Sequence, residues 1–311
     1  ELLTVDFPII MAPMFLVSNE AMIVAGMKNG IAAAFPTLNY RNKGELEQLL
    51  DNLNKEKKQL TANGNYGVNL IVQKTNPLYE EHLKICVEKK VPFYITSLGN
   101  PRKVFCDVTN VEHAKKCYEA GCDGFIAVGQ GAGGHAGPNP LQILIPALYH
   151  QFPDTPVIAA GGIADGEGIL SMLTLGAAGV SIGTRFIASV EAPVNQEYKN
   201  AIVSSGMNDI VLTEKLSGTP CNIINTPLAK KIGYKQNWLE RLLSNNSTTK
   251  KYFKMWVQLS GMKKLEESVK PGNYKTLWCA GQSVELIHEV STCEAIISRL
   301  KKENWDAFDK I

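Results

Sequence analysis

The sequence predicts an α/β fold, a (β/α)8 TIM barrel with a helical insertion, or lid, before the C-terminal helix. Over the first two thirds of the chain, short apolar or β-branched runs alternate with amphipathic stretches, which is the pattern of βα units. Eight such runs are present, and eight parallel strands close a barrel. The runs cover residues 9–12, 31–35, 66–72, 93–96, 104–107, 124–128, 157–160 and 179–183.

Helices are predicted between most of these runs. Ser18 can cap a helix over residues 20–29, and Asn110 can cap the helix after the fifth run. Only residues 97–103 separate the fourth run from the fifth, whereas a parallel crossover takes at least about 10–12 residues. Either the protein lacks a helix there or the chain as written omits residues. We favour the second explanation, because barrel closure is expected to require that crossover.

The pattern changes after Arg185. Residues 191–205 and 237–262 are predicted to be Lys-rich helices, and residues 219–227 between them are rich in turn formers. Residues 283–300 are predicted to form a final helix that completes the outer ring of the barrel.

This change in pattern divides the chain into two predicted parts. We predict that residues 1–193 and 281–311 form the barrel, and that residues 194–280 form a mainly helical insertion covering its active-site end. The insertion carries lysine pairs, which usually mark a solvated face and otherwise a docking surface for an acidic partner. The pairs stand at residues 230–231, 250–251 and 263–264.

The composition excludes several classes of protein. A net charge of +2 gives no general attraction to nucleic acid, and no stretch approaches the roughly 20 apolar residues that span a bilayer. The N-terminus has no signal-peptide pattern. Seven cysteines without a CxxC pair argue against a disulfide framework or a metal site, so we expect a cytoplasmic protein.

Two glycine turns stand where catalytic and phosphate-binding groups collect in such barrels, at the carboxyl ends of strands. Gly161 and Gly162 follow the seventh run, and Gly183 and Thr184 follow the eighth. Neighbouring strands would place these turns side by side, where glycine lets backbone amides approach a phosphate. A phosphate-bearing ligand is the favoured interpretation, and two ordinary tight βα turns are the alternative.

A second group of glycines surrounds one histidine, in the segment 128–137 after the sixth run. His135 has no neighbouring side chains to bury it, and its loop is expected at the functional end of the barrel. An imidazole there can donate or accept a proton near neutral pH. The other four histidines lie in helical or surface contexts and are interpreted as structural.

Other strand ends carry weaker signals. Met14 after Pro13 offers a flexible apolar surface for a flat ring system, or it is simply a plug of the barrel. Asn69 and Asp107 could hydrogen-bond a cofactor, or they could cap the turns that follow them.

These motifs resemble the nitronate monooxygenases, formerly called 2-nitropropane dioxygenases, along nearly the whole chain. The order AGGHxG, GGIADG and GTRF is specific to this superfamily but does not separate all its members. The matching segments are PIIMAPM (8–14), GVNLIV (67–72), SLGNP (97–101), DVTNVEHAKK (107–116), AVGQGAGGHAG (127–137), PVIAAGGIADG (156–166), GTRF (183–186) and AGQS (280–283).

The resemblance implies an FMN cofactor, with His135 in the position of the family's catalytic histidine. Its phosphate would lie on the two glycine turns and its ring against residues 12–14. Asp107 stands where some members carry a lysine, so that lysine's role does not carry over. The residues expected to bind the cofactor are Ala12, Pro13, Met14, Asn69, Asp107, Gln130, Gly133, Gly134, Gly161, Gly162, Gly183 and Thr184.

The activity that the resemblance implies is oxidation of alkyl nitronates, such as propionate 3-nitronate, by O2 to a carbonyl compound and nitrite. Two alternatives share the barrel: an FMN-dependent enoyl-acyl carrier protein reductase, whose acidic partner the lysine pairs would suit, and an NAD(P)H:quinone reductase. A third alternative, from a different class of function, is a flavin-free barrel that binds a phosphorylated metabolite. Whether the chain forms a homodimer stays open.

Overall fold

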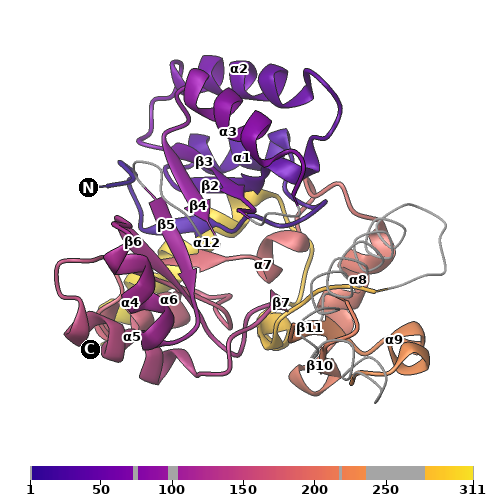
Figure 1. Cartoon of the computed structure of the whole chain (residues 1–311). Helices are drawn as coiled ribbons and strands as arrows, with labels where there is room; N and C mark the ends of the chain where they lie inside the picture. Colours follow the sequence, from indigo (N-terminus) through magenta and orange to yellow (C-terminus); the bar gives the residue numbers. More distant parts are fainter. Residues whose placement is uncertain (1, 73–75, 97–103, 217–218, 236–276, 311) are drawn as a thin grey trace, which may run out of the picture.

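The computed structural model describes residues 2–72, 76–96, 104–216, 219–235 and 277–310. Eight parallel strands form a closed barrel, which confirms the predicted TIM barrel (Figure 1). Each predicted run overlaps one of these strands. In the order of their pairing they are β1 (Ile9–Met11), β2 (Ala32–Pro36), β3 (Asn65–Leu70), β4 (Phe93–Thr96), β5 (Val104–Val108), β6 (Gly124–Val128), β8 (Val157–Ala160) and β9 (Gly179–Ile182).

Helices surround the barrel (Figure 1). The last of them contacts α1 and α6 and so completes the outer ring. The predicted final helix over residues 283–300 is wrong at both ends, because a 3-10 turn, η3 (Gln282–Leu286), comes first and Thr292 caps the helix by accepting from the amide of Ala295. The helices are α1 (Glu20–Lys28), α2 (Glu45–Lys57), α3 (Tyr79–Glu88), α4 (Val111–Glu119), α5 (Leu141–Gln151), α6 (Gly166–Thr174), α7 (Thr184–Ile187) and α12 (Cys293–Phe308).

One predicted helix cap is confirmed and the other is wrong. Asn110 caps α4, since its side chain accepts from the amide of His113 at 2.7 Å. At α1 the cap is Asn19 rather than Ser18, with the Asn19 side chain accepting from Met22. Ser18 lies one residue before the cap, and its hydroxyl instead accepts from the amide of Met14 at 2.9 Å and donates to the carbonyl oxygen of Ala12.

The barrel interior is filled by apolar side chains from alternate strand positions. The rings of Phe93 and Phe105 meet edge to face, with their centroids 6.4 Å apart. Gly67 makes room for them, because a Cβ there would lie 2.4 Å from the Phe93 ring. The interior is therefore a packed core, and only its ends can hold a site.

Strands β4 and β5 pair directly, with Thr96 opposite Cys106. The barrel closes with only residues 97–103 between them, so the expectation that closure requires a longer crossover is wrong. Residues 97–103 themselves lie outside the described part of the chain.

The described part of residues 194–280 forms a small unit beside the barrel, next to β7 (Gly134–His135) (Figure 1). Strand β7 belongs to a three-stranded antiparallel sheet in the order β10-β11-β7. The turn-rich segment 219–227 thus contains a strand, and the predicted helix 191–205 begins later, after the cap Asn195. The elements of the unit are α8 (Gln196–Ser204), η2 (Met207–Asp209), β10 (Ile210–Thr213), β11 (Cys221–Ile224) and α9 (Pro227–Ile232).

The predicted helix over residues 237–262 and two of the three lysine pairs lie outside the described residues. The pair at 230–231 is exposed at the end of α9. A separate, mainly helical unit covering the active-site end stays a prediction.

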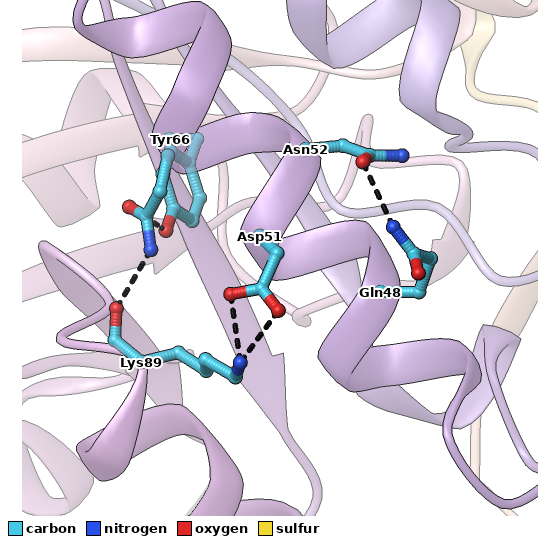
Figure 2. A network of polar contacts seen from close by, with 6 residues as sticks. Gln48, Asp51, Asn52, Tyr66 and Lys89 are labelled. Atoms are coloured by element: carbon cyan, nitrogen blue, oxygen red, sulfur yellow. Dashed lines mark hydrogen bonds and ion pairs between the residues drawn. The ribbon is translucent and has the colours of Figure 1, made fainter.

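The outer layer at the amino ends of the strands is held by a polar network (Figure 2). Asn54 donates to the carbonyl oxygen of Lys89 at 2.9 Å and accepts from the hydroxyl of Tyr66 at 2.8 Å. Lys89 also pairs with Asp51. In TIM barrels this end serves stability, and the opposite end carries the site. None of the helices within the described ranges has the length and apolarity needed to cross a membrane.

Candidate active site

The carboxyl end of β1 lies against the turn after β9. The amide of Ala12 donates to the carbonyl oxygen of Ile182 at 2.9 Å. A Cβ built on Gly183 would lie 3.6 Å from both the Cβ of Ala12 and the Sδ of Met14. The structure therefore brings together one predicted ring-binding segment and one predicted phosphate-binding turn.

The segment 12–14 is held rigidly in this position. Met14 donates its amide to Ser18, as described above, and its carbonyl oxygen accepts from the Asn39 side chain at 3.3 Å. Met14 itself is half-buried, with its thioether beside Gly183. A flexible, polarizable side chain of this kind suits contact with a flat ring.

The two glycine turns are side by side, as predicted. Strands β8 and β9 are neighbours, with Ala160 opposite Ser181, and the turns follow directly. Gly161 and Gly162 have φ of +116° and +77°, a conformation that only glycine adopts readily. The nearest atom to a Cβ on Gly162 would be 3.9 Å away, so the space above this turn is open.

These turns have the features of a phosphate cradle. Within the described residues, the amides of Gly162 and Gly183 donate to no recorded backbone or side-chain acceptor. Unused amides beside open space are what a phosphate group needs, and glycine lets them approach it closely. The residues present therefore fit the phosphate end of a cofactor.

The glycine-rich loop after β6 packs directly onto this cradle. A Cβ on Gly131 would lie 3.1 Å from the Cα of Gly162, and one on Gly133 would lie 2.9 Å from the Thr184 hydroxyl. On its other side the loop meets Gly281, where a Cβ would be 2.3 Å from the carbonyl oxygen of Gly131. Side chains would prevent these contacts, which explains the run of glycines.

His135 stands at the end of this loop, in β7. It pairs with Cys221 of β11, and the preceding Gly134 pairs with Asn222. The imidazole is exposed, yet the surrounding protein desolvates it enough to lower its pKa. A lowered pKa favours the neutral imidazole near pH 7, which is the form that accepts a proton.

Gln130, at the start of the loop, is exposed. Its backbone is fixed at both groups, because its amide donates to the carbonyl oxygen of Asn139 and its carbonyl oxygen accepts from the side chain of Asn222. Gln130 therefore lies on the same loop as Gly133, Gly134 and His135, as predicted.

Asn69 and Asp107 lie at another part of the barrel mouth. They follow the interior positions of Gly67 and Phe105 by two residues, so strand alternation places them on the interior face at the carboxyl ends of β3 and β5. Both are half-buried. Strands β3 and β5 are not neighbours of β9, so these residues could meet only a ligand that extends across the mouth.

Two features of the site were not predicted. Asn222 reaches the glycine-rich loop from β11, and Tyr198 of α8 stacks on Trp278 with ring centroids 5.4 Å apart. The Tyr198 hydroxyl donates to the carbonyl oxygen of Cys279. A lone asparagine and a helical tyrosine carry no motif, so no signal in the sequence singles them out.

Known proteins resemble this chain over much of its length. The nitronate monooxygenase family model matches residues 103–303. A probable nitronate monooxygenase of Staphylococcus saprophyticus is 30% identical over 251 residues, which cover 73% of this chain and 67% of that protein. The (3aS,4S,5R,7aS)-5-hydroxy-7a-methyl-1-oxo-octahydro-1H-indene-4-carboxyl-CoA dehydrogenase of Rhodococcus jostii is 37% identical over 126 residues. That match spans 40% of this chain and only 35% of the dehydrogenase.

Solved structures give the same architecture. FabK from Thermotoga maritima superposes with a TM-score of 0.81 at 29% identity, covering 99% of this chain and 96% of that one. A nitroalkane oxidase from Streptomyces ansochromogenes superposes with a TM-score of 0.77, covering 99% and 98% of the two chains. At 21% identity this second likeness shows the shared fold alone. With the family model matching more than half of its residues, this chain belongs to the nitronate monooxygenase family of flavin-dependent barrel oxidoreductases.

Proposed function

We propose that the chain binds FMN at the carboxyl end of the barrel and oxidises alkyl nitronates, such as propionate 3-nitronate, with O2. The products would be a carbonyl compound and nitrite. The observation that supports this most is the contact of the His135 loop with the Gly161-Gly162 turn, which joins a proton-handling group to a phosphate cradle in one site.

The residues that would hold FMN are those that line the two sides of the cradle. The amides of Gly162 and Gly183, with the neighbouring Gly161 and Thr184, would bind the phosphate. Ala12, Pro13 and Met14 would support the ring system, and the loop at Gln130, Gly133 and Gly134 would border it. Asn69 and Asp107 would meet its polar atoms across the barrel mouth. When bound, the flavin supplies the electron-transfer chemistry.

His135 would act on the substrate. Its neutral imidazole, favoured by the lowered pKa, can remove the α-proton of a neutral nitroalkane, and as a donor it can hydrogen-bond the nitronate oxygens. Backbone amides of the surrounding loop would stabilise negative charge on the substrate. Small substrates reach this group because the imidazole is exposed.

The test follows the visible absorption of the flavin bands. The protein is purified in air, its spectrum is recorded, and propionate 3-nitronate or NADPH is added to separate anaerobic samples. Bleaching by nitronate and not by NADPH is expected. A protein that shows no flavin spectrum and cannot be reconstituted with FMN would contradict the proposal.

A second candidate is an FMN-dependent reductase of an enoyl thioester that takes its electrons from a reduced nicotinamide. It is favoured by the 37% identity to a dehydrogenase whose named substrate is a coenzyme A thioester, and by the exposed lysine pair 230–231, which would suit an acidic acyl carrier protein. Rapid bleaching by NADPH with no response to nitronate would select this reductase, or a quinone reductase, over nitronate oxidation.

A further inference from the structure

The glycine-rich loop is clamped along its length by one short segment of the neighbouring unit. The Asn222 side-chain nitrogen donates to the carbonyl oxygens of Gln130 at 2.9 Å and Ala132 at 2.8 Å. The backbone of β11 pairs with Gly134 and His135, and the amide of Ala136 donates to the carbonyl oxygen of Pro220 at 3.2 Å. Residues 220–222 therefore contact the loop at its start, middle and end.

Asn222 makes these contacts in a buried position, with 6% of its surface exposed. The backbone carbonyl oxygen of Asn222 accepts from the amide of Ala280 at 3.3 Å. Hydrogen bonds shielded from water are costly to lose, because the groups left behind stay desolvated. Asn222 thus contacts the loop through its side chain, and β7 and the segment before η3 through its backbone.

The loop provides little support of its own beyond two long backbone hydrogen bonds, from the amides of Ala132 and Gly137 to the carbonyl oxygen of Gly129 at 3.3 Å. Four of the residues from Gly129 to Gly134 are glycines, which have no side chains to pack and a large backbone freedom. Gly134, just before His135, has a φ of +70°. Without external hydrogen bonds this stretch would have many conformations of similar energy.

We propose that Asn222 is a positioning residue for the reaction: it fixes the loop that carries Gln130, Gly133, Gly134 and His135. This role rests on the function proposed above. Asn222 acts through the loop, and its two recorded bonds use both protons of one amide nitrogen. A carboxylate, which is only an acceptor, would face the same two carbonyl oxygens and repel them.

The test compares Asn222→Asp, Asn222→Ala and wild-type holoenzyme, with Asn54→Asp as the matched control. Asn54 also donates from its side chain to a backbone carbonyl, that of Lys89, but in the network between α2 and the end of α3, away from the loop. The measurements are the FMN dissociation constant by fluorescence titration, kcat and KM with propionate 3-nitronate, and hydrogen exchange of residues 129–137.

Asn222→Asp should bind FMN at least about tenfold more weakly near pH 7.5, since two hydrogen bonds are replaced by repulsion. Burial against two carbonyl oxygens should raise the pKa of the introduced carboxyl above its usual value of about 3.9. Part of the loss should therefore be recovered relative to wild type near pH 5, where the protonated carboxyl can donate one bond. Asn222→Ala should weaken binding without this recovery. Exchange of residues 129–137 should be faster in both variants and unchanged in Asn54→Asp.

A merely structural role predicts that Asn222→Asp and Asn54→Asp behave alike, with no recovery at low pH, and this result would overturn the proposal. So would wild-type exchange rates in residues 129–137 of Asn222→Asp. If wild-type protein fails to react with nitronate, the proposed function fails instead. In that case hydrogen exchange and FMN affinity still decide the role of Asn222.

Discussion

The amide of Gly281 donates a hydrogen bond to the Thr184 hydroxyl oxygen, 3.0 Å away and 97 residues earlier in the chain. Both residues are buried. Thr184 follows the last barrel strand, and Gly281 also packs on the glycine-rich loop, as shown above. This single bond therefore joins the cradle, the loop and the segment before α12.

Replacing Thr184 with valine tests the bond. Valine keeps the side-chain shape but leaves the buried amide of Gly281 without its acceptor, which should lower the free energy of unfolding by about 1–3 kcal/mol. The control is Thr174→Val, at an exposed position of α6, where the hydroxyl bonds within its own helix and the change should stay within about 0.5 kcal/mol. Equal urea midpoints for the two variants would show that the bond contributes nothing.

The open space above Gly162 gives a second prediction. Gly162→Ala should weaken FMN binding at least about tenfold, because the new methyl group enters the cradle. Alanine at a φ of +77° also costs about 1–2 kcal/mol of stability.

Gly233 separates these two effects. Its φ is +79° with ψ of 170°, a conformation essentially restricted to glycine, and a Cβ there would meet nothing within 4 Å. Gly233→Ala should therefore carry backbone strain away from the cradle. Both variants should lose stability by chemical denaturation, and only Gly162→Ala should lose affinity for FMN. If both variants bind FMN as wild type does, Gly162 does not line the phosphate site.

The barrel was predictable from the sequence because each strand is an apolar run bounded by turn formers. The β8–β9 pair was also predictable, since consecutive βα units in a barrel are neighbours. Strand β7 was not, because two residues such as Gly134 and His135 carry no periodicity. Its partner β11 lies in a segment rich in turn formers, where local composition favoured a loop.

The site was predictable only where a motif marked it. Glycine turns and one histidine in a glycine-rich loop are visible in the sequence because their chemistry is local. Asn222 acts on residues about 90 positions away, and the structure alone reveals that contact. Ser18 failed as a helix cap for a local reason, since the helix begins one residue later, at the cap Asn19, and the Ser18 hydroxyl accepts from Met14 four residues earlier.

His135→Asn tests the catalytic role. Asparagine keeps a hydrogen-bonding side chain but cannot take up a proton, so FMN should stay bound while kcat/KM for a neutral nitroalkane falls by about 10²–10⁴. The wild-type rate should fall on the acid side with an apparent pKa below about 6.5, because desolvation by the surrounding protein lowers the pKa of His135 and protonation removes the base. His150→Asn, at the exposed end of α5, should behave as wild type. Unchanged turnover in His135→Asn would exclude the imidazole from the reaction.

A second histidine should control stability rather than catalysis. His82 is buried in α3, and its Nδ1 atom has no hydrogen-bond partner among the residues that the structure describes. Burial lowers the pKa of His82, while the nearby Glu81 and Glu47 oppose this shift with a smaller effect. Below about pH 6.5 the unfolded chain therefore binds this proton more readily than the folded chain does, and stability falls with falling pH.

His82→Leu should remove this acid sensitivity, because leucine fills a similar space and does not titrate. The free energy of unfolding, measured by urea denaturation between about pH 7.5 and pH 5.5, should fall less steeply in the variant than in wild type. His288→Leu, at an exposed position between η3 and α12, is the control and should keep the wild-type slope. Parallel slopes for His82→Leu and wild type would mean that the proton uptake responsible for acid sensitivity occurs at other residues.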